Sequence, residues 1–434
     1  MKSAALRGAC TLWITGVLSG AAHADPLNPL EFPSLGAVTL LVGSTYTINS
    51  MTGTLTGASL NLAGTYRGSK LVFAFDSLTV PAATNIVING RKPVALISSG
   101  HLDFDGNLIY VGNPGSGGGA SIPGTGGSGA GSGGGGVIAP SAGFNPGGGI
   151  GGGTSSSRGG SFGGNGGGTS NATYGNLLLH LEGGSGGSGA YSPGPSGASG
   201  GGAGGGAIEL GSLQTLRLGF GTVITVDGGS GSVGSNFGGG GSGGGVLLHG
   251  STVNIAASSV VRARGGPGQS VGGGGRIAVQ SVNTPVTSGF FVTGAEAGVI
   301  TSARVSLVST GIDFGDVPVG SSRTLVLGAE NAGDPDTSLN GRFPEAKAPF
   351  FRVGNGVFSG VRPGRAAANK YSFFPTTTGE VTQHLAFESN AGPVIVTLTG
   401  RGVAPTCFGD LNQDGQVNTT DLIEFLNRFG RICP

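Results

Sequence analysis

The chain has 434 residues, of which only 10% are charged, and its formal net charge is +1. This length is sufficient for two to four domains. The Lys and Arg residues form no cluster that could follow a phosphate backbone or anchor the chain to an anionic membrane, which excludes a nucleic-acid-binding protein. No run after the first 24 residues reaches about 18 apolar positions, so we expect no transmembrane segment.

The N-terminus has the features of an export signal. Lys2 and Arg7 precede an apolar run at 9–22, and the small-x-small sequence Ala22-His23-Ala24 follows. A positive start, a short apolar core and such a cleavage site are typical of a secretory signal peptide. We therefore predict that residues 1–24 are removed near Ala24, that Asp25 is the mature N-terminus, and that the protein is secreted or held at the cell surface.

The segment 25–300 is predicted to form a glycine-rich β-solenoid. It begins with short apolar runs at 38–42, 71–75 and 86–88, separated by Gly, Ser, Thr and Asn. Similar bursts then recur at 94–97, 207–210, 246–249 and 276–279. Each burst suits a strand and is too short for a helix. Similarity at a period of roughly 20 to 50 residues predicts rungs that stack as in a parallel β-helix, because one rung cannot bury its apolar face alone.

About two thirds of the 96 glycines lie between positions 112 and 275, around these bursts. Three interpretations of the glycine tracts remain open. They could be turns and excursions of the solenoid, or a disordered Gly/Ser linker, above all at 115–168. They could also pack side by side as extended chains like polyproline II, because glycine permits close approach.

The segment 301–404 is predicted to be a separate antiparallel β-sandwich. The glycine tracts stop after Val282, and about seven strand-like runs follow over a hundred residues. The sequence at 312–321, followed by 325–327 and 330–333, resembles the choice-of-anchor D module of bacterial surface proteins. That immunoglobulin-like module is related to the ASH domain of ciliary and centrosomal proteins. The resemblance implies a spacer or interaction domain.

The segment 405–434 carries the most specific chemical motif, at 410–421. Oxygen-bearing side chains stand at loop positions 1, 3, 5, 9 and 12, with Gly415 at position 6, which is the EF-hand calcium spacing. The predicted Ca²⁺ ligands are the side chains of Asp410, Asn412, Asp414 and Asp421, the backbone carbonyl of Gln416, and Asn418 directly or through water.

A helix should follow the loop. Asn418 is suited to cap it, and Leu422, Phe425, Leu426 and Phe429 fall on one face before Gly430. The alternative is an Asp/Asn-rich turn that binds no ion. Cys407 and Cys433 flank the module and are expected to form a disulfide in an oxidising compartment, the alternative being two free thiols.

The same stretch resembles a single dockerin repeat, which also ends its loop with Asp. The resemblance implies that Thr419 and Thr420, just before the last ligand, contact a cohesin-like or cell-surface partner. Full dockerins carry two repeats and this chain shows one.

The sequence offers little for catalysis. Asp103 and Asp105 alternate along one strand and form the best carboxylate pair, but we favour a solvated strand face as their explanation over a catalytic pair. His101, His180 and His249 show no metal-binding spacing. We therefore favour an exported, non-catalytic scaffold or adhesion protein with a calcium-stabilised docking module. The alternative is a polysaccharide-active β-helix lyase or glycoside hydrolase.

Overall fold

The structure is a computed structural model, and it describes the chain from residue 26 to residue 431 with gaps. The described ranges are 26–115, 158–168, 172–178, 180–191, 198–232, 238–282, 285–294, 298–309, 311–335, 337–392, 394–405, 409–412 and 414–431. Within them the protein is mainly β, as predicted, with one α-helix, α1 (Thr419–Arg428). None of its described helices is both long and apolar enough to cross a membrane. The predicted signal peptide and both predicted disulfide cysteines lie outside the described residues.

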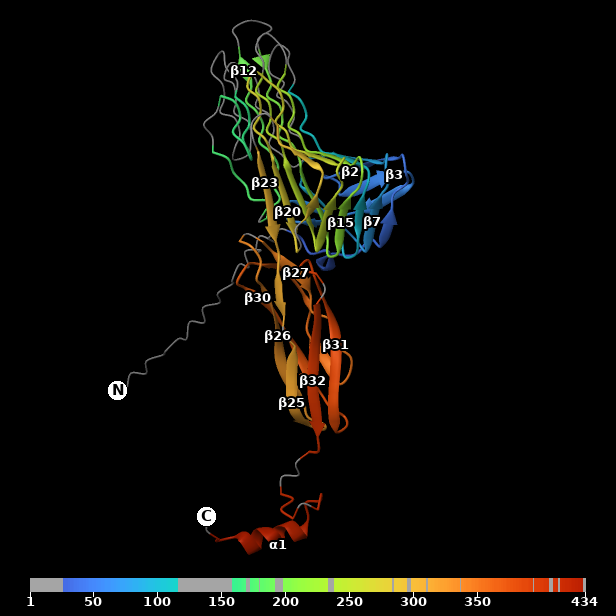
Figure 1. The fold of residues 1–434 in the computed structure, drawn as a ribbon, viewed down its shortest axis with the longest axis vertical. Helices are drawn as coiled ribbons and strands as arrows, with labels where there is room; N and C mark the ends of the chain where they lie inside the picture. The colour runs from blue at the N-terminus through green and yellow to red at the C-terminus, as the bar shows by residue number, and fades with distance from the viewer. Residues whose placement is uncertain are drawn as a thin grey trace, which may run out of the picture.

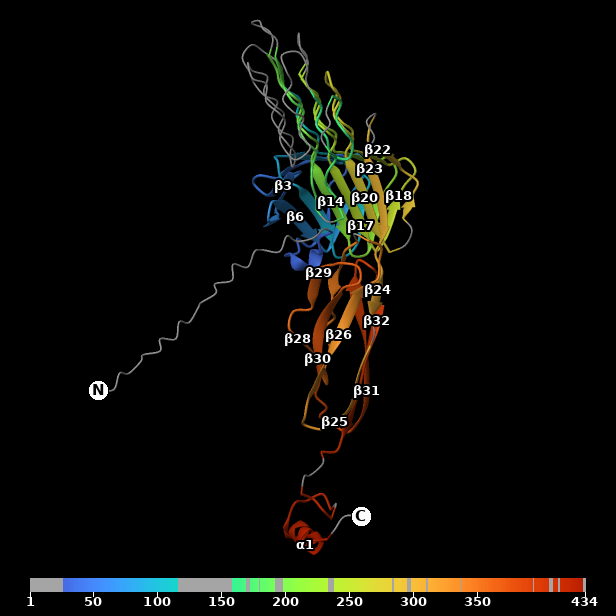
Figure 2. The same ribbon diagram turned by 90° about the vertical axis from the view of Figure 1, so that its left-hand side faces the viewer.

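Three sheets form the first unit, which we call the coil (Figures 1 and 2). In spatial order, sheet I contains β1 (Ala37–Thr39), β7 (Ser77–Val80), β10 (Leu102–Phe104), β15 (Thr215–Leu218), β18 (Thr252–Ile255) and β21 (Val286–Thr287). Sheet II contains β22 (Phe290–Val292), β19 (Val260–Arg262), β16 (Val223–Thr225), β11 (Asn107–Ile109), β8 (Asn85–Asn89), β2 (Thr45–Asn49), β3 (Thr54–Gly57) and β4 (Leu60–Ala63). Sheet III contains β23 (Val299–Arg304), β20 (Arg276–Ser281), β17 (Gly245–Gly250), β14 (Ala207–Ser212), β9 (Val94–Ser98), β6 (Lys70–Phe75) and β5 (Thr65–Arg67).

Successive turns of the chain add one strand to each sheet, and strands of neighbouring turns pair in parallel. Thus β14, β15 and β16 pair with β17, β18 and β19 of the next turn. The register brings like residues together: Leu216 lies opposite Val253, and Ile224 opposite Val261. These side chains are buried in one core enclosed by the three sheets. Burial alternates along the strands of sheets I and II, which explains the period-two pattern of the sequence.

The central strands of sheet III are buried on both faces. The segment that contains η1 (Pro29–Glu31) covers part of its outer face, where Leu27 and Phe32 pack on Val72 and Ala95. Phe162, Leu177, Leu178 and Leu181, from the glycine-rich region, cover another part. Two coverings therefore explain why β6, β9, β14 and β17 are apolar runs rather than alternating strands.

The described glycine tracts extend from sheet III as a hydrogen-bonded bundle, which we call the glycine bundle (112–115, 158–168, 183–188, 200–206, 226–232, 238–244 and 263–275; Figure 2). Its hydrogen bonds repeat every three residues. In the chain 239–244, residues 239 and 242 donate to 188 and 185, residues 240 and 243 to 270 and 273, and residues 241 and 244 to 229 and 226. Successive residues therefore bond to three neighbouring chains in rotation. This matches a polyproline II helix, which has three residues per turn.

Glycine is required where these chains touch. A Cβ atom at Gly241 would collide with the carbonyl oxygen of Ala203, and one at Gly244 with that of Gly206. The described tracts are therefore ordered, and of the three interpretations they match side-by-side extended chains. One short pair of strands, β12 (Ala190–Tyr191) and β13 (Ala198–Ser199), adds an antiparallel contact. Most of the longest tract, 116–157, lies outside the described residues.

The second unit is a β-sandwich of two sheets. One sheet has the order β24 (Leu307–Ser309), β26 (Arg323–Asn331), β30 (Ala366–Phe373) and β28 (Phe350–Val353). The other has the order β25 (Ile312–Pro318), β32 (Val394–Val403), β31 (Gly379–Ser389), β27 (Leu339–Arg342) and β29 (Val357–Val361). Phe314, Phe350 and Phe373 stack in the core between them.

The N-terminal segment ties the sandwich to the coil. Asn28 is fully buried, and its side-chain amide donates to the carbonyl oxygens of Gly341 (3.0 Å) and Phe358 (2.9 Å). Asn340 of the sandwich donates in return to the carbonyl of Pro26. Gln280 of the coil adds a bond of 2.8 Å to the carbonyl of Ser338. Pairing of these buried polar groups makes the junction specific.

Candidate functional site

The loop before α1 brings three carboxylates together. Asp410, Asp414 and Asp421 each offer an oxygen, and these oxygens lie within 4.8 Å of one another. Oxygen ligands lie about 2.3–2.6 Å from Ca²⁺, so two ligands of one ion are at most about 5 Å apart. The spacing of the three carboxylates therefore fits a single calcium ion.

Backbone amides of the loop hold these carboxylates in position. Asp410 accepts from the N–H groups of Asp414 (3.1 Å) and Gly415 (2.7 Å). Asp414 accepts from the N–H of Gln416 at 2.9 Å. Gly415 has φ of +86°, a left-handed conformation that suits glycine and allows the chain to reverse here.

Asp421 connects the loop to the helix. Its carboxylate accepts from the N–H groups of Asn418 (2.8 Å), Leu411 (2.7 Å) and Asn412 (3.3 Å). These bonds lower the pKa of Asp421 because they favour its charged form, and the bond from Asn418 has the largest effect. Asn418 in turn accepts from the N–H of Thr420 at 2.8 Å, completing a capping box. The predicted N-cap of the helix is confirmed.

The other predicted ligands occupy different positions. The amide nitrogen of Asn412 donates to Asp414 and to Thr420, both at 3.0 Å, and its amide oxygen accepts from the N–H of Asp414. The amide oxygen of Asn418 is engaged in capping. The side chain of Gln416 is exposed. The geometry thus brings three of the six predicted ligands together as carboxylates, while the amide oxygens of Asn412 and Asn418 accept hydrogen bonds within the loop and the helix cap.

The helix exposes its apolar side chains. Leu422, Ile423, Phe425, Leu426 and Phe429 are all close to half exposed or more, and the rings of Phe425 and Phe429 lie 5.6 Å apart. Thr419 and Thr420, the predicted partner-contacting pair, are exposed at the start of the same helix. The module therefore presents an apolar surface next to the carboxylate loop.

The predicted carboxylate pair in the coil has a structural partner. Arg217, from β15, donates to Asp103 at 3.0 Å and to Asp105 at 2.7 Å. These hydrogen bonds raise the pKa of Arg217, and the bond with Asp105 has the larger effect. Both carboxylates are thus engaged in ion pairs with one arginine of the neighbouring turn.

A buried ionic group was not anticipated from the sequence. Glu209 is completely buried on the outer face of sheet III, where it lies 2.9 Å from Nε2 of His249 and accepts from the N–H of Leu27 at 2.6 Å. Burial alone would raise the pKa of Glu209, but His249 and the charge of Lys70 outweigh that effect and lower the pKa. Glu209 and His249 each lie in one of the regularly spaced apolar runs. That spacing was the one sequence signal that could have placed these two residues on neighbouring turns.

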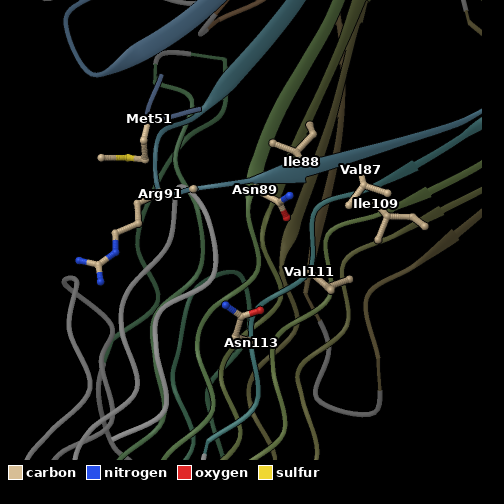
Figure 3. A pocket seen from close by; sticks show the side chains of 9 residues that line it. Met51, Val87, Ile88, Asn89, Arg91, Ile109, Val111 and Asn113 are labelled. Carbon is tan, nitrogen blue, oxygen red and sulfur yellow. The ribbon is translucent and has the colours of Figure 1, made fainter. Parts of the chain in front are cut away.

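A pocket of about 370 Å³ lies on the outer face of sheet II, beside the glycine bundle (Figure 3). Its lining combines apolar side chains, two amides and one cation: Met51, Val87, Ile88, Asn89, Arg91, Ile109, Val111 and Asn113. The lining contains no carboxylate or imidazole, so it offers contact surface without a general acid or base.

Comparison with known proteins gives no family. No family model and no curated protein matches the chain. Solved structures resemble about a quarter of it. An ASH/PapD-like domain of human CEP192 is 14% identical, with a TM-score of 0.20, and the match covers 23% of this chain and 86% of that domain.

Two further solved structures match at a similar level. A Porphyromonas gingivalis W83 protein of unknown function is 10% identical, with a TM-score of 0.19, and the match covers 25% of this chain and 54% of that one. The Vibrio cholerae VesB protease is 13% identical, with a TM-score of 0.18, and the match covers 22% and 31%. At this level of similarity none of the three informs on activity, so the chemistry must be judged from the residues.

Proposed function

We propose that the protein is an exported, non-catalytic scaffold whose C-terminal module binds Ca²⁺ and docks to a partner. The convergence of Asp410, Asp414 and Asp421 on one point supports this proposal most strongly. Three like charges at this distance repel one another, and a divalent cation bound between them would offset most of this repulsion. No ion pair joins any of the three to a basic side chain within the described residues.

In this proposal Ca²⁺ would be held by Asp410, Asn412, Asp414, Gln416, Asn418 and Asp421. The ion's role is structural, because it would fix the loop against the first turn of α1 and so orient the apolar helix surface. Thr419, Thr420 and that surface would contact a cohesin-like or cell-surface protein. The coil and the sandwich, which resemble a β-helix and a choice-of-anchor D domain, would act as a stem and a spacer.

Calcium binding is tested by isothermal titration of the purified mature chain. We expect Asp410→Ala combined with Asp414→Ala to abolish the heat of Ca²⁺ binding. In the same double variant, Ca²⁺ should no longer protect residues 410–428 from proteolysis. Asp313→Ala, which changes an exposed carboxylate of the sandwich, is the matched control and should titrate like the native chain. Unchanged binding in the double variant would refute the assignment.

The polysaccharide-active alternative is tested separately. Arg217 holds both Asp103 and Asp105 in ion pairs, so we expect no cleavage when the mature chain is incubated with a panel of polysaccharides. Reproducible cleavage that disappears in Asp103→Asn or Asp105→Asn would replace the scaffold proposal by that of an enzyme.

A further inference from the structure

All three sheets of the coil end at the same turn. The last strands are β21 in sheet I, β22 in sheet II and β23 in sheet III, and each stands at the edge of its sheet. Figure 2 shows β22 and β23 at the same end of the stack. We call this turn the open end.

The core of the coil is exposed at the open end. Ile300 of β23 pairs with Ile277 of β20 and occupies the same inward-facing position. Ile277 is 1% exposed and Ile300 is 51% exposed, because no further turn covers it. Val286 of β21 and Phe290 of β22, 59% and 62% exposed, stand on the last strands of the other two sheets and pair with the outward-facing Asn254 and Val260. At the first turn, by contrast, β2, β3 and β4 form antiparallel hairpins that bury Leu55.

The open end also has unpaired backbone. The N–H of Val299 donates to Gly275, so alternate residues 299, 301 and 303 face β20 and residues 300, 302 and 304 face away. The N–H of Arg304 is bonded to Asp334 at 2.9 Å. Within the described residues, the backbone groups of Ile300 and of position 302 have no partner. Such a row of free groups is a template for another strand.

The charge distribution indicates which strand would fit. Charged side chains commonly protect free edges, and the first turn has Arg67 on β5 and the exposed Arg91 before β9. The described residues of β21, β22 and β23 include one charged side chain, Arg304, at the last position. Two open ends can therefore meet without bringing like charges together, whereas stacking on the first turn would bury cations and grow into filaments.

We propose that the open end is a self-association surface that docks against the open end of a second copy. In this closed, two-fold dimer β23 pairs antiparallel with β23 of the other copy. The register follows if the free backbone groups of Ile300 and of position 302 both form hydrogen bonds with the second copy. Ile300 then faces position 302 of the second copy, and Thr301 faces Thr301 across the two-fold axis. The exposed Ile300 side chain, which continues the inward-facing row of Ile277, is then removed from water, which supplies the driving force.

The first test is the mass of the purified mature chain by sedimentation equilibrium across a wide range of concentration. We expect twice the monomer mass for the native chain and for Val326→Lys, a change at a similarly exposed position on the sandwich. Ile300→Lys should give the monomer mass. Because Ile300 is already half exposed, this variant should fold, and an unchanged circular dichroism spectrum checks that it does.

A second test examines the register. Residues opposite each other in a non-hydrogen-bonded antiparallel pair have Cα atoms about 4.5 Å apart, within the reach of a disulfide. Thr301→Cys should therefore crosslink the native dimer on mild oxidation, and Val326→Cys should not. A native chain that is monomeric at every concentration, a series of higher masses, an Ile300→Lys dimer, or equal crosslinking of both cysteine variants would each overturn the proposal.

Discussion

Asp421 performs two tasks in the C-terminal module. It is one of three converging carboxylates, and it also accepts backbone hydrogen bonds from both the loop and the helix N-cap. An isolated ten-residue helix is marginal in water, so α1 depends on such anchoring contacts. The charge of one side chain therefore couples helix formation to the state of the loop.

The lowered pKa of Asp421 leads to a pH prediction. A carboxyl with a lower pKa in the folded state stabilises that state above its unfolded pKa, about 3.9, and the stabilisation is lost as the pH falls through the folded pKa. We expect NMR chemical shifts of residues 419–428, in calcium-free buffer, to lose helical character as the pH falls below about 4.

Asp421→Asn supplies the comparison for this pH prediction. It keeps an amide oxygen as an acceptor but cannot titrate, so its helix should be weaker at neutral pH and nearly independent of pH. Glu424→Gln, which alters only the exposed pair with Arg428, is the control. A pH dependence in Asp421→Asn equal to that of the native chain would assign the transition to another group.

The glycine bundle shows how an element can form without side chains. Each residue from 239 to 244 donates its N–H to a neighbouring chain, and the neighbours alternate with a period of three. The chains approach so closely that carbonyl oxygens occupy the space of a Cβ atom. Hydrogen bonding and close packing thus replace the burial of apolar side chains as the source of order.

Alanine substitution tests this account of the bundle. Gly241→Ala must displace the backbone at Ala203, and we expect a loss of about 1–3 kcal/mol, as for other overpacked sites. Thermal unfolding of the mature chain should show this as a lower midpoint. Gly328→Ala is the matched control, because nothing lies within 4 Å of the added carbon. Equal midpoints for both variants would mean that the bundle is looser than described.

Much of the fold and of the carboxylate loop could be predicted from local sequence patterns. The features that depend on contacts between residues far apart in the sequence could not. The apolar bursts at 207–210 and 246–249 revealed strands because their spacing repeats, and the loop 410–421 revealed its carboxylates through ligand spacing. The three-residue repeat of hydrogen bonds in the glycine bundle could not be predicted, because packing between distant chains, and not a pattern of side chains, decides which backbone groups pair. Asn28 gave no signal either, since its partner Gly341 is 313 positions away.

At the scale of the whole molecule, the first described residues act as a clamp between the coil and the sandwich. Asn28 bonds to two sandwich carbonyls, while Leu27 packs on sheet III and donates to Glu209. Asn28→Ala would leave both carbonyls buried without these donors, at a cost of about 1–3 kcal/mol.

We expect calorimetry to show one coupled unfolding transition of the coil and the sandwich in the native chain, and two separate transitions in Asn28→Ala. Asn61→Ala, at an exposed position on β4, should behave like the native chain. If Asn28→Ala kept a single transition at the native midpoint, other junction contacts, such as that between Gln280 and Ser338, would be sufficient to couple the two units.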